Sequence, residues 1–167
     1  SVQLALAQKT IRARRGWAAY CGVDTVLGAF EISDRTGVTM DLVVETAIEM
    51  FRRSSLGIKR MLPSHAHHLE MSFGIAAGRV EFEHVESKMG RHANIYGEAR
   101  NNAFIMKSNA DGSAIVIDPG LYERLDYAAR WFQPLARNVE VGQPAVTGFV
   151  CNLRQLMGAK SRSIPSS

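Results

Sequence analysis

Two short stretches of this chain carry residue types that are suited to handling charged phosphate groups. In residues 20–30, a tight turn between two apolar segments places one carboxylate, Asp24, at its tip. In residues 95–103, a short apolar strand passes through Gly97 into a helix whose opening turn is polar. A carboxylate on a rigid hairpin and an amide at a helix start are suited to binding a metal-bound polyphosphate. Each stretch is a weak motif alone, so its interpretation depends on the elements around it.

The hydrophobic pattern predicts alternating helices and strands that can position both stretches. Helices are expected over residues 2–15, 40–60, 96–109 and 119–125, and strands over 17–21, 25–32, 69–75, 79–85, 114–117 and 143–152. The strands at 69–75 and 79–85 are expected to form a hairpin around Gly74 and Gly78. We therefore predict an α/β fold in which helices pack on a mixed, antiparallel-rich sheet.

Size and composition restrict the class of protein. The chain has 167 residues and is 46% hydrophobic, which predicts one globular domain over 1–154 and a flexible tail over 155–167. No apolar run approaches the roughly 20 residues that cross a bilayer, and no signal peptide opens the chain, so a cytoplasmic protein without a membrane partner is expected. Buried free thiols are favoured over a disulfide for Cys21 and Cys151. No aromatic residues alternate with the basic ones, so no nucleic-acid partner is expected.

The order of elements, together with its motifs, resembles the catalytic domain of class III nucleotidyl cyclases. Residues 23–30 are similar to the family's Gly-Asp-x-x-Leu-x-x-Phe hairpin, and residues 69–80 to its Gly-Ile-x-x-Gly-x-Val strand pair. Residues 97–103 resemble its Gly-x-x-Val-Asn-x-Ala helix start. The resemblance runs from about Trp17 to Leu153 and implies a ferredoxin-like βαββαβ core. That core needs one more strand, which would lie upstream of Ser1.

The resemblance implies a reaction and a metal cofactor. In this family two aspartates hold two divalent metals, Mg²⁺ or Mn²⁺, on a nucleoside triphosphate, and the ribose 3′ hydroxyl attacks the α-phosphorus and expels pyrophosphate. Asp24 falls on the second aspartate position, and the first would lie on the absent strand. The alternative for Asp24 is an ordinary turn aspartate that bonds its own backbone.

Further positions are assigned from the resemblance. Asn101 matches the asparagine that orients the ribose, although an amide at a helix start also satisfies backbone groups. The transition-state arginine of the family corresponds to Ile105, which cannot carry charge. Arg100 or Lys107 is the alternative source of that charge, and Arg137 is the nearest candidate for gripping the terminal phosphates.

The base-recognition positions of the family correspond to Tyr20 and Asn94. Neither is the Lys or Asp that suits adenine; a tyrosine leaves less room for a two-ring base, and an amide matches the imide edge of uracil. This combination resembles the pyrimidine cyclases of the bacterial Pycsar antiphage systems. The alternatives are a core aromatic for Tyr20 and a loop amide for Asn94.

The resulting hypothesis is a homodimeric cyclase that converts UTP to cyclic UMP and pyrophosphate, with a separate effector that reads the product. Formation of cyclic CMP or cyclic AMP is the nearest alternative. An inactive cyclase-like module for nucleotide binding or dimerisation is a second hypothesis. A third is an unrelated ferredoxin-like interaction domain, in which Asp24, Asn94 and Asn101 do not share a cleft.

Overall fold

The computed structural model describes the chain except residues 1, 65–68, 89, 138–144 and 163–167 and the side chains of 85, 87, 90–93, 136–137, 145–146 and 159–162. The elements follow in the order α1 Val2–Ala13, β1 Trp17–Cys21, β2 Thr25–Ala29, α2 Met40–Met61, β3 Ser72–Ile75, β4 Glu81–Ser87, β5 Gly90–Tyr96, α3 Glu98–Ser108, β6 Ala114–Ile117, α4 Pro119–Glu123, a 3₁₀ helix Tyr127–Trp131, β7 Gln133–Arg137, β8 Ala145–Asn152 and α5 Leu153–Arg162. Among these residues, no helix is both long and apolar enough to cross a bilayer.

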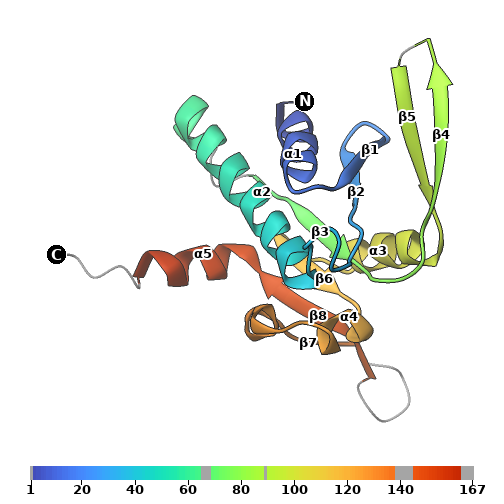
Figure 1. The fold of residues 1–167 in the computed structure, drawn as a ribbon. Helices are drawn as coiled ribbons and strands as arrows, with labels where there is room; N and C mark the ends of the chain where they lie inside the picture. The colour runs from blue at the N-terminus through green and yellow to red at the C-terminus, as the bar shows by residue number, and fades with distance from the viewer. Residues whose placement is uncertain (1, 65–68, 89, 138–144, 163–167) are drawn as a thin grey trace.

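The described strands form three sheets (Figure 1). The largest has four strands in the order β3-β6-β8-β7, with β3 parallel to β6 and the other pairs antiparallel. β1 pairs with β2, and β4 pairs with β5, in two antiparallel hairpins. The β4–β5 hairpin projects away from the rest of the molecule (Figure 1). The predicted α/β class with a mixed sheet is confirmed.

β6 and α2 form the centre of the hydrophobic core. All four residues of β6 are buried, as expected for a strand that is covered on both faces and therefore apolar throughout. The buried face of α2 includes Val44, Ala47 and Phe51, which belong to the same core cluster as Ile115 and Ile117 of β6. Complete burial of such a side chain contributes about 1.5–3 kcal/mol.

α2 and α3 lie on opposite faces of β3. A Cβ at Gly74 would sit 1.9 Å from the carbonyl oxygen of Ala103, so α3 packs directly on the backbone of β3. Successive residues of a strand point to opposite faces. Phe73 and Ile75 therefore point away from α3, and they pack on the core to which α2 contributes. Gly74 is the residue that permits this close approach.

The predicted hairpin between residues 69–75 and 79–85 is wrong. β3 instead pairs with β6, and β4 pairs with β5. The physical reason is that β5 is longer than the sequence pattern indicates, so β4 has an antiparallel partner only a short turn away. The short apolar β3 is then free to lie beside the fully buried β6.

The chain after β8 also differs from expectation. The flexible tail predicted from residue 155 is helical as far as Arg162. The Oδ1 atom of Asn152 accepts a hydrogen bond from the backbone N–H of Gln155 at 2.9 Å, which caps the start of α5. Leu153, the first residue of α5, is completely buried in the core. These two contacts hold the start of α5 in place.

Candidate functional site

Asp24 lies at the tip of the β1–β2 hairpin, as predicted. Cys21 pairs with Thr25 across the hairpin, so residues 22–24 form the turn. Gly22 adopts a φ of 75°, a conformation that glycine reaches without strain. The Asp24 side chain is exposed, and its Oδ1 atom accepts a hydrogen bond from the Thr25 hydroxyl at 3.0 Å. The local sequence thus presents a carboxylate to solvent on a short, hydrogen-bonded turn.

The described residues of one chain do not complete a metal site. Among them, no group of three or more His, Cys, Asp or Glu side chains comes together in a way that could hold a metal ion. Mg²⁺ binds about six oxygen ligands, and one or two of these are usually protein carboxylates. Asp24 alone therefore offers a single ligand.

Tyr20 and Asn94 lie on neighbouring strands. β1 and β5 lie side by side, and the rings of Trp17 on β1 and Phe82 on β4 are in contact, with centroids 5.0 Å apart. The Tyr20 side chain is 55% exposed, so the alternative of a buried core aromatic is wrong. Asn94 is exposed on β5 rather than in a loop. Both side chains thus lie outside the core, on two adjacent strands.

A polar pair next to Asn94 was missed by the sequence analysis. The Tyr96 hydroxyl donates a hydrogen bond to Oε2 of Glu83 at 3.0 Å, and Glu83 is paired with Asn94 in the β4–β5 register. This hydrogen bond is the main cause that raises the pKa of Tyr96, with added contributions from partial desolvation and the Glu83 charge. Asn94 and the charge of Arg100 act in the opposite direction. Tyr96 and Asn94 are two residues apart and so share a strand face, which is the signal that could have indicated the group.

Asn101 lies in the first turns of α3, and its side chain is exposed. Gly97 is the N-cap residue, and a Cβ there would be 2.6 Å from the carbonyl oxygen of Arg79, so the helix start is held close to the β3–β4 connection. No side chain forms a capping hydrogen bond at this helix start in the described structure. Asn101 therefore does not act as the cap of α3.

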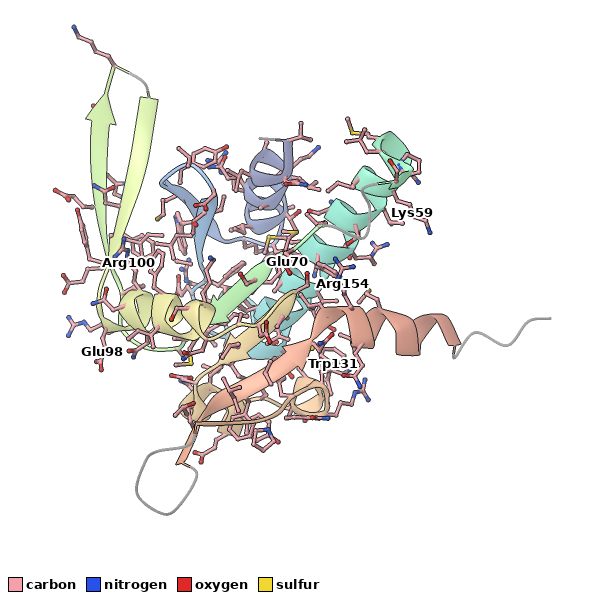
Figure 2. The ribbon with its side chains drawn as sticks, turned by 180° about the vertical axis from the view of Figure 1, so that it is seen from behind. Lys59, Glu70, Glu98, Arg100, Trp131 and Arg154 are labelled. Carbon is pink, nitrogen blue, oxygen red and sulfur yellow. The ribbon has the colours of Figure 1, made fainter. Side chains whose placement is uncertain are left out.

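The three positions considered for transition-state charge have different surroundings on α3. Ile105 lies one turn beyond Asn101 and is 52% exposed. Lys107 lies on the part of α3 that packs on β3, where a Cβ on Gly74 would be 2.3 Å from its backbone nitrogen. Arg100 lies at the base of the β4–β5 hairpin (Figure 2), with its guanidinium 4.9 Å from the centre of the Phe104 ring. Of the two predicted cations on α3, Arg100 is the one beside the Tyr96–Glu83 pair.

A cavity of about 680 Å³ lies between β2, β3, α2 and α3. Arg100 lines this cavity, whereas Asp24, Tyr20, Asn94 and Asn101 are not part of its described lining. The structure of a single chain thus brings Tyr20 near the strand of Asn94 but does not join Asp24 and Asn101 in one cavity. The side chain of Arg137, the predicted phosphate residue, lies outside the described part, although its backbone ends β7.

Comparison with solved structures identifies the fold. No protein-family model matches the chain, and its sequence matches none of the curated proteins compared with it. The adenylyl cyclase CyaB from P. aeruginosa superposes with a TM-score of 0.63 over 90% of this chain and 78% of that one, at 14% identity. The guanylate cyclase domain of RhGC from Catenaria anguillulae, in complex with GTP, gives 0.60 over 90% and 81%, at 19% identity. The chain has the class III cyclase fold.

A third cyclase structure agrees with the first two. The catalytic core of a rhodopsin-guanylyl cyclase with converted specificity, in complex with ATPαS, superposes with a TM-score of 0.61 over 90% of this chain and 79% of that one, at 18% identity. At such identities the likeness concerns the cyclase fold alone. The fold predicted from the sequence motifs is confirmed, and the activity is a separate question.

Proposed function

We propose that this chain is the catalytic domain of a nucleotide cyclase, which converts a nucleoside triphosphate, preferably UTP, to a 3′,5′-cyclic nucleotide and pyrophosphate. The observation that carries the proposal is the cyclase fold over 90% of the chain. It is supported by the exposed positions of Asp24 at a hairpin tip and Asn101 at a helix start. These are the two positions that the sequence motifs assign to metal and ribose.

The proposed site lies between two copies of the chain. Asp24 and Asn101 are both exposed, and neither lines the cavity that one chain forms. A second copy can bring the hairpin tip of one protomer against the α3 start of the other. Asp24 would then supply one ligand to Mg²⁺ or Mn²⁺, and the other ligands come from substrate phosphates and from residues outside those described.

The preference for a pyrimidine is supported by Tyr20 and Asn94. They lie on the adjacent strands β1 and β5 with exposed side chains, and we propose that both contact one base. The Asn94 amide offers a donor and an acceptor, which match the imide edge of uracil. Cytosine and adenine remain the alternative bases. We further propose that the product acts as an antiphage second messenger, as in the Pycsar systems, and that a separate effector binds it.

Arg100 is the proposed source of transition-state charge in place of Ile105. Arg100 lies at the base of the β4–β5 hairpin (Figure 2), and it also lines the cavity between β3 and α3. Arg137 is retained as the proposed phosphate residue. Lys107 is the less favoured cation because its segment of α3 packs on β3.

A second candidate function is an inactive cyclase-like module that binds nucleotide or dimerises. Two observations favour it: Ile105 stands at the arginine position, and the described residues hold a single proposed metal ligand. Such a module would bind a nucleotide without turning it over.

An assay of the full-length protein with each of the four nucleoside triphosphates and Mn²⁺ tests both candidates. Products are separated by liquid chromatography and identified by mass, and pyrophosphate is measured in parallel. The proposal expects cyclic UMP and pyrophosphate in equal amounts. Another cyclic nucleotide would overturn the substrate preference. Nucleotide binding by calorimetry without any product would favour the inactive module.

A further inference from the structure

One face of the β4–β5 hairpin carries a connected group of polar side chains. Asn94 and Tyr96 share this face of β5, whereas Ile95 between them is 4% exposed and belongs to the opposite face. Glu83 of β4 is the cross-strand partner of Asn94, so it lies on the same face. The side chains of Glu83, Asn94 and Tyr96 are all exposed, so each is open to a ligand.

The Tyr96 side chain crosses this face diagonally. In the register of the hairpin Tyr96 lies opposite Glu81, yet its hydroxyl donates to Oε2 of Glu83 at 3.0 Å. Diagonal neighbours on one face of a sheet are about 7–8 Å apart, a distance that an aromatic side chain can span. The Tyr96 ring therefore leans along the strand toward Asn94, and its hydroxyl lies beside the Glu83–Asn94 pair.

The Tyr96 hydroxyl acts on Asn94 as a hydrogen-bond acceptor. A phenol has one proton, and Glu83 accepts it, so the tyrosine oxygen has only lone pairs left for a second neighbour. Glu83 raises the pKa of Tyr96 most strongly, whereas a hydrogen bond with the Asn94 side chain lowers that pKa. A donor that stabilises the tyrosinate has this effect. The Asn94 amide thus turns its NH₂ group, rather than its carbonyl oxygen, toward Tyr96.

An amide of fixed orientation discriminates between bases. With one N–H engaged by Tyr96, the Asn94 amide keeps its carbonyl oxygen and its second N–H for a ligand. Uracil offers a ring N–H donor next to an exocyclic oxygen acceptor. Cytosine and adenine offer the reverse, a ring nitrogen acceptor next to an exocyclic amino donor. Because the two patterns require opposite orientations of the amide, one fixed orientation separates uracil from the other two bases.

We propose that Glu83 is a positioning residue for base selection: by accepting the Tyr96 proton, it holds the Asn94 amide in the orientation that suits uracil. The inference rests on the proposed function, in which Asn94 contacts the base. Without an acceptor at position 83, the Tyr96 hydroxyl can donate to the Asn94 carbonyl oxygen instead, and the amide can turn over. Glu83 thus acts through Tyr96 and Asn94 rather than by touching the base.

NMR of the nucleotide-free, full-length protein with ¹⁵N-labelled asparagine tests the orientation of the amide. Asn94→Asp assigns the Asn94 side-chain NH₂ signals. We expect Glu83→Ala and Tyr96→Phe to shift these signals. Glu81→Ala is the matched control, because Glu81 lies on the same face and opposite Tyr96, and it is expected to leave them unchanged. Equal spectra for Glu83→Ala and Glu81→Ala overturn the proposal.

Nucleotide binding tests base selection in the same variants. Calorimetry with Mg²⁺ compares UTP and CTP analogues that carry a methylene group between the α- and β-phosphorus and so cannot be cyclised. The wild-type protein and Glu81→Ala are expected to bind the UTP analogue at least about tenfold more tightly than the CTP analogue. Glu83→Gln is expected to keep this ratio, because its carbonyl oxygen still accepts the Tyr96 proton. Glu83→Ala is expected to reduce the ratio to about twofold or less.

The outcomes separate this inference from the proposed function. A ratio that Glu83→Ala leaves unchanged overturns the role of Glu83 and leaves the proposed function intact. An equal loss of affinity for both analogues in Glu83→Ala also overturns that role, because a merely structural residue would have this effect. If the wild-type protein binds neither analogue, the proposed function fails and base selection through Glu83 fails with it.

Discussion

At the scale of single residues, the candidate chemistry depends on side chains that face solvent rather than on buried ones. Asp24, Tyr20, Asn94 and Asn101 are all exposed, so none of them is needed for the packing of the core. Substitutions at such positions usually change stability by less than about 0.5 kcal/mol. A loss of activity at these residues can therefore be separated from a loss of folding.

The carboxylate of Asp24 can be tested with an isosteric change. Asp24→Asn keeps the size of the side chain and removes its charge, so the proposed metal ligand is weakened. We expect the cyclase rate in Mn²⁺ to fall by about 10²-fold or more, with an unchanged melting temperature. Asp34→Asn, at another exposed loop position, is the matched control and is expected to retain full activity. Equal rates for the two variants would exclude Asp24 from the site.

Substitution of Ile105 tests whether an added positive charge increases activity. Its side chain is 52% exposed, and arginine is a good helix former, so Ile105→Arg is expected to fold normally. If α3 presents this position to the transition state, the added charge should raise turnover by about tenfold or more. The measurement is the initial rate of cyclic nucleotide formation, with Ile105→Gln as a neutral control. Equal rates for the Ile105→Arg and Ile105→Gln variants would contradict a role for charge at this position.

The Tyr96 hydroxyl gives a prediction about pH. Its hydrogen bond to Glu83 raises its folded pKa above the ordinary tyrosine value of about 10, so the bond is fully present below that pH and is lost as pH rises through the folded pKa. Glu83→Gln is expected to lower this pKa. The titration is followed by NMR of tyrosine labelled at Cζ, and Tyr96→Phe assigns the signal. An unchanged titration in Glu83→Gln would contradict the hydrogen bond.

At the scale of elements, the position of α3 is set by its contact with β3. The backbone of α3 near Ala103 and Lys107 approaches Gly74 so closely that no side chain fits between them. This contact fixes the helix that presents Arg100 and Asn101, and it lies at the side of the cavity away from α2.

Gly74→Ala tests this contact. The added Cβ would lie 1.9 Å from the Ala103 carbonyl oxygen, which is backbone and must shift with the helix. We expect a loss of about 1–3 kcal/mol in the free energy of unfolding, measured by urea denaturation. The matched control is Gly57→Ala within α2, where nothing lies within 4 Å of the new Cβ. That change is expected to be neutral or to stabilise by up to about 1 kcal/mol. Equal stability of the two variants would contradict the packing of α3 on β3.

At the scale of the whole molecule, the proposed active site requires two copies of the chain. In the proposed site, the β1–β2 hairpin and the α3 start carry different parts, Asp24 and Asn101, and both side chains are exposed to solvent. A closed two-fold dimer contains two equivalent sites, each built from both protomers.

Mixing two inactive variants tests this arrangement. Asp24→Asn and Asn101→Ala proteins are expected to be inactive alone. If they exchange subunits at random, half of the dimers are mixed and each has one intact site, so about a quarter of the wild-type activity returns. The measurement is cyclic nucleotide formation after co-incubation, with subunit exchange monitored by native mass spectrometry. Mixed dimers without recovered activity would show that both residues serve the same chain.

The sequence predicted those elements whose pattern is set by short-range chemistry. The sequence predicted α2 because its apolar residues recur at helical spacing. It predicted β6 because four consecutive apolar residues follow a turn. The strand that pairs with β3 could not be predicted, since nothing within residues 69–75 distinguishes a hairpin with β4 from parallel pairing with β6. The helix α5 was missed because its cap, Asn152, and its buried Leu153 have meaning only beside the rest of the core.

The same division applies to the candidate site. The sequence by itself determined that Asp24 occupies a turn and that Asn101 follows a helix start, because glycine at positions 22 and 97 permits the positive φ values, 75° and 124°, that this turn and this helix start adopt. The tertiary structure decided which side chains gather: Tyr96 with Glu83 and Asn94, Tyr20 on the strand beside Asn94, and Arg100 rather than Lys107 at the base of the hairpin. Strand pairing and the rotation of a helix on a sheet depend on contacts between distant segments. A local pattern does not contain those contacts.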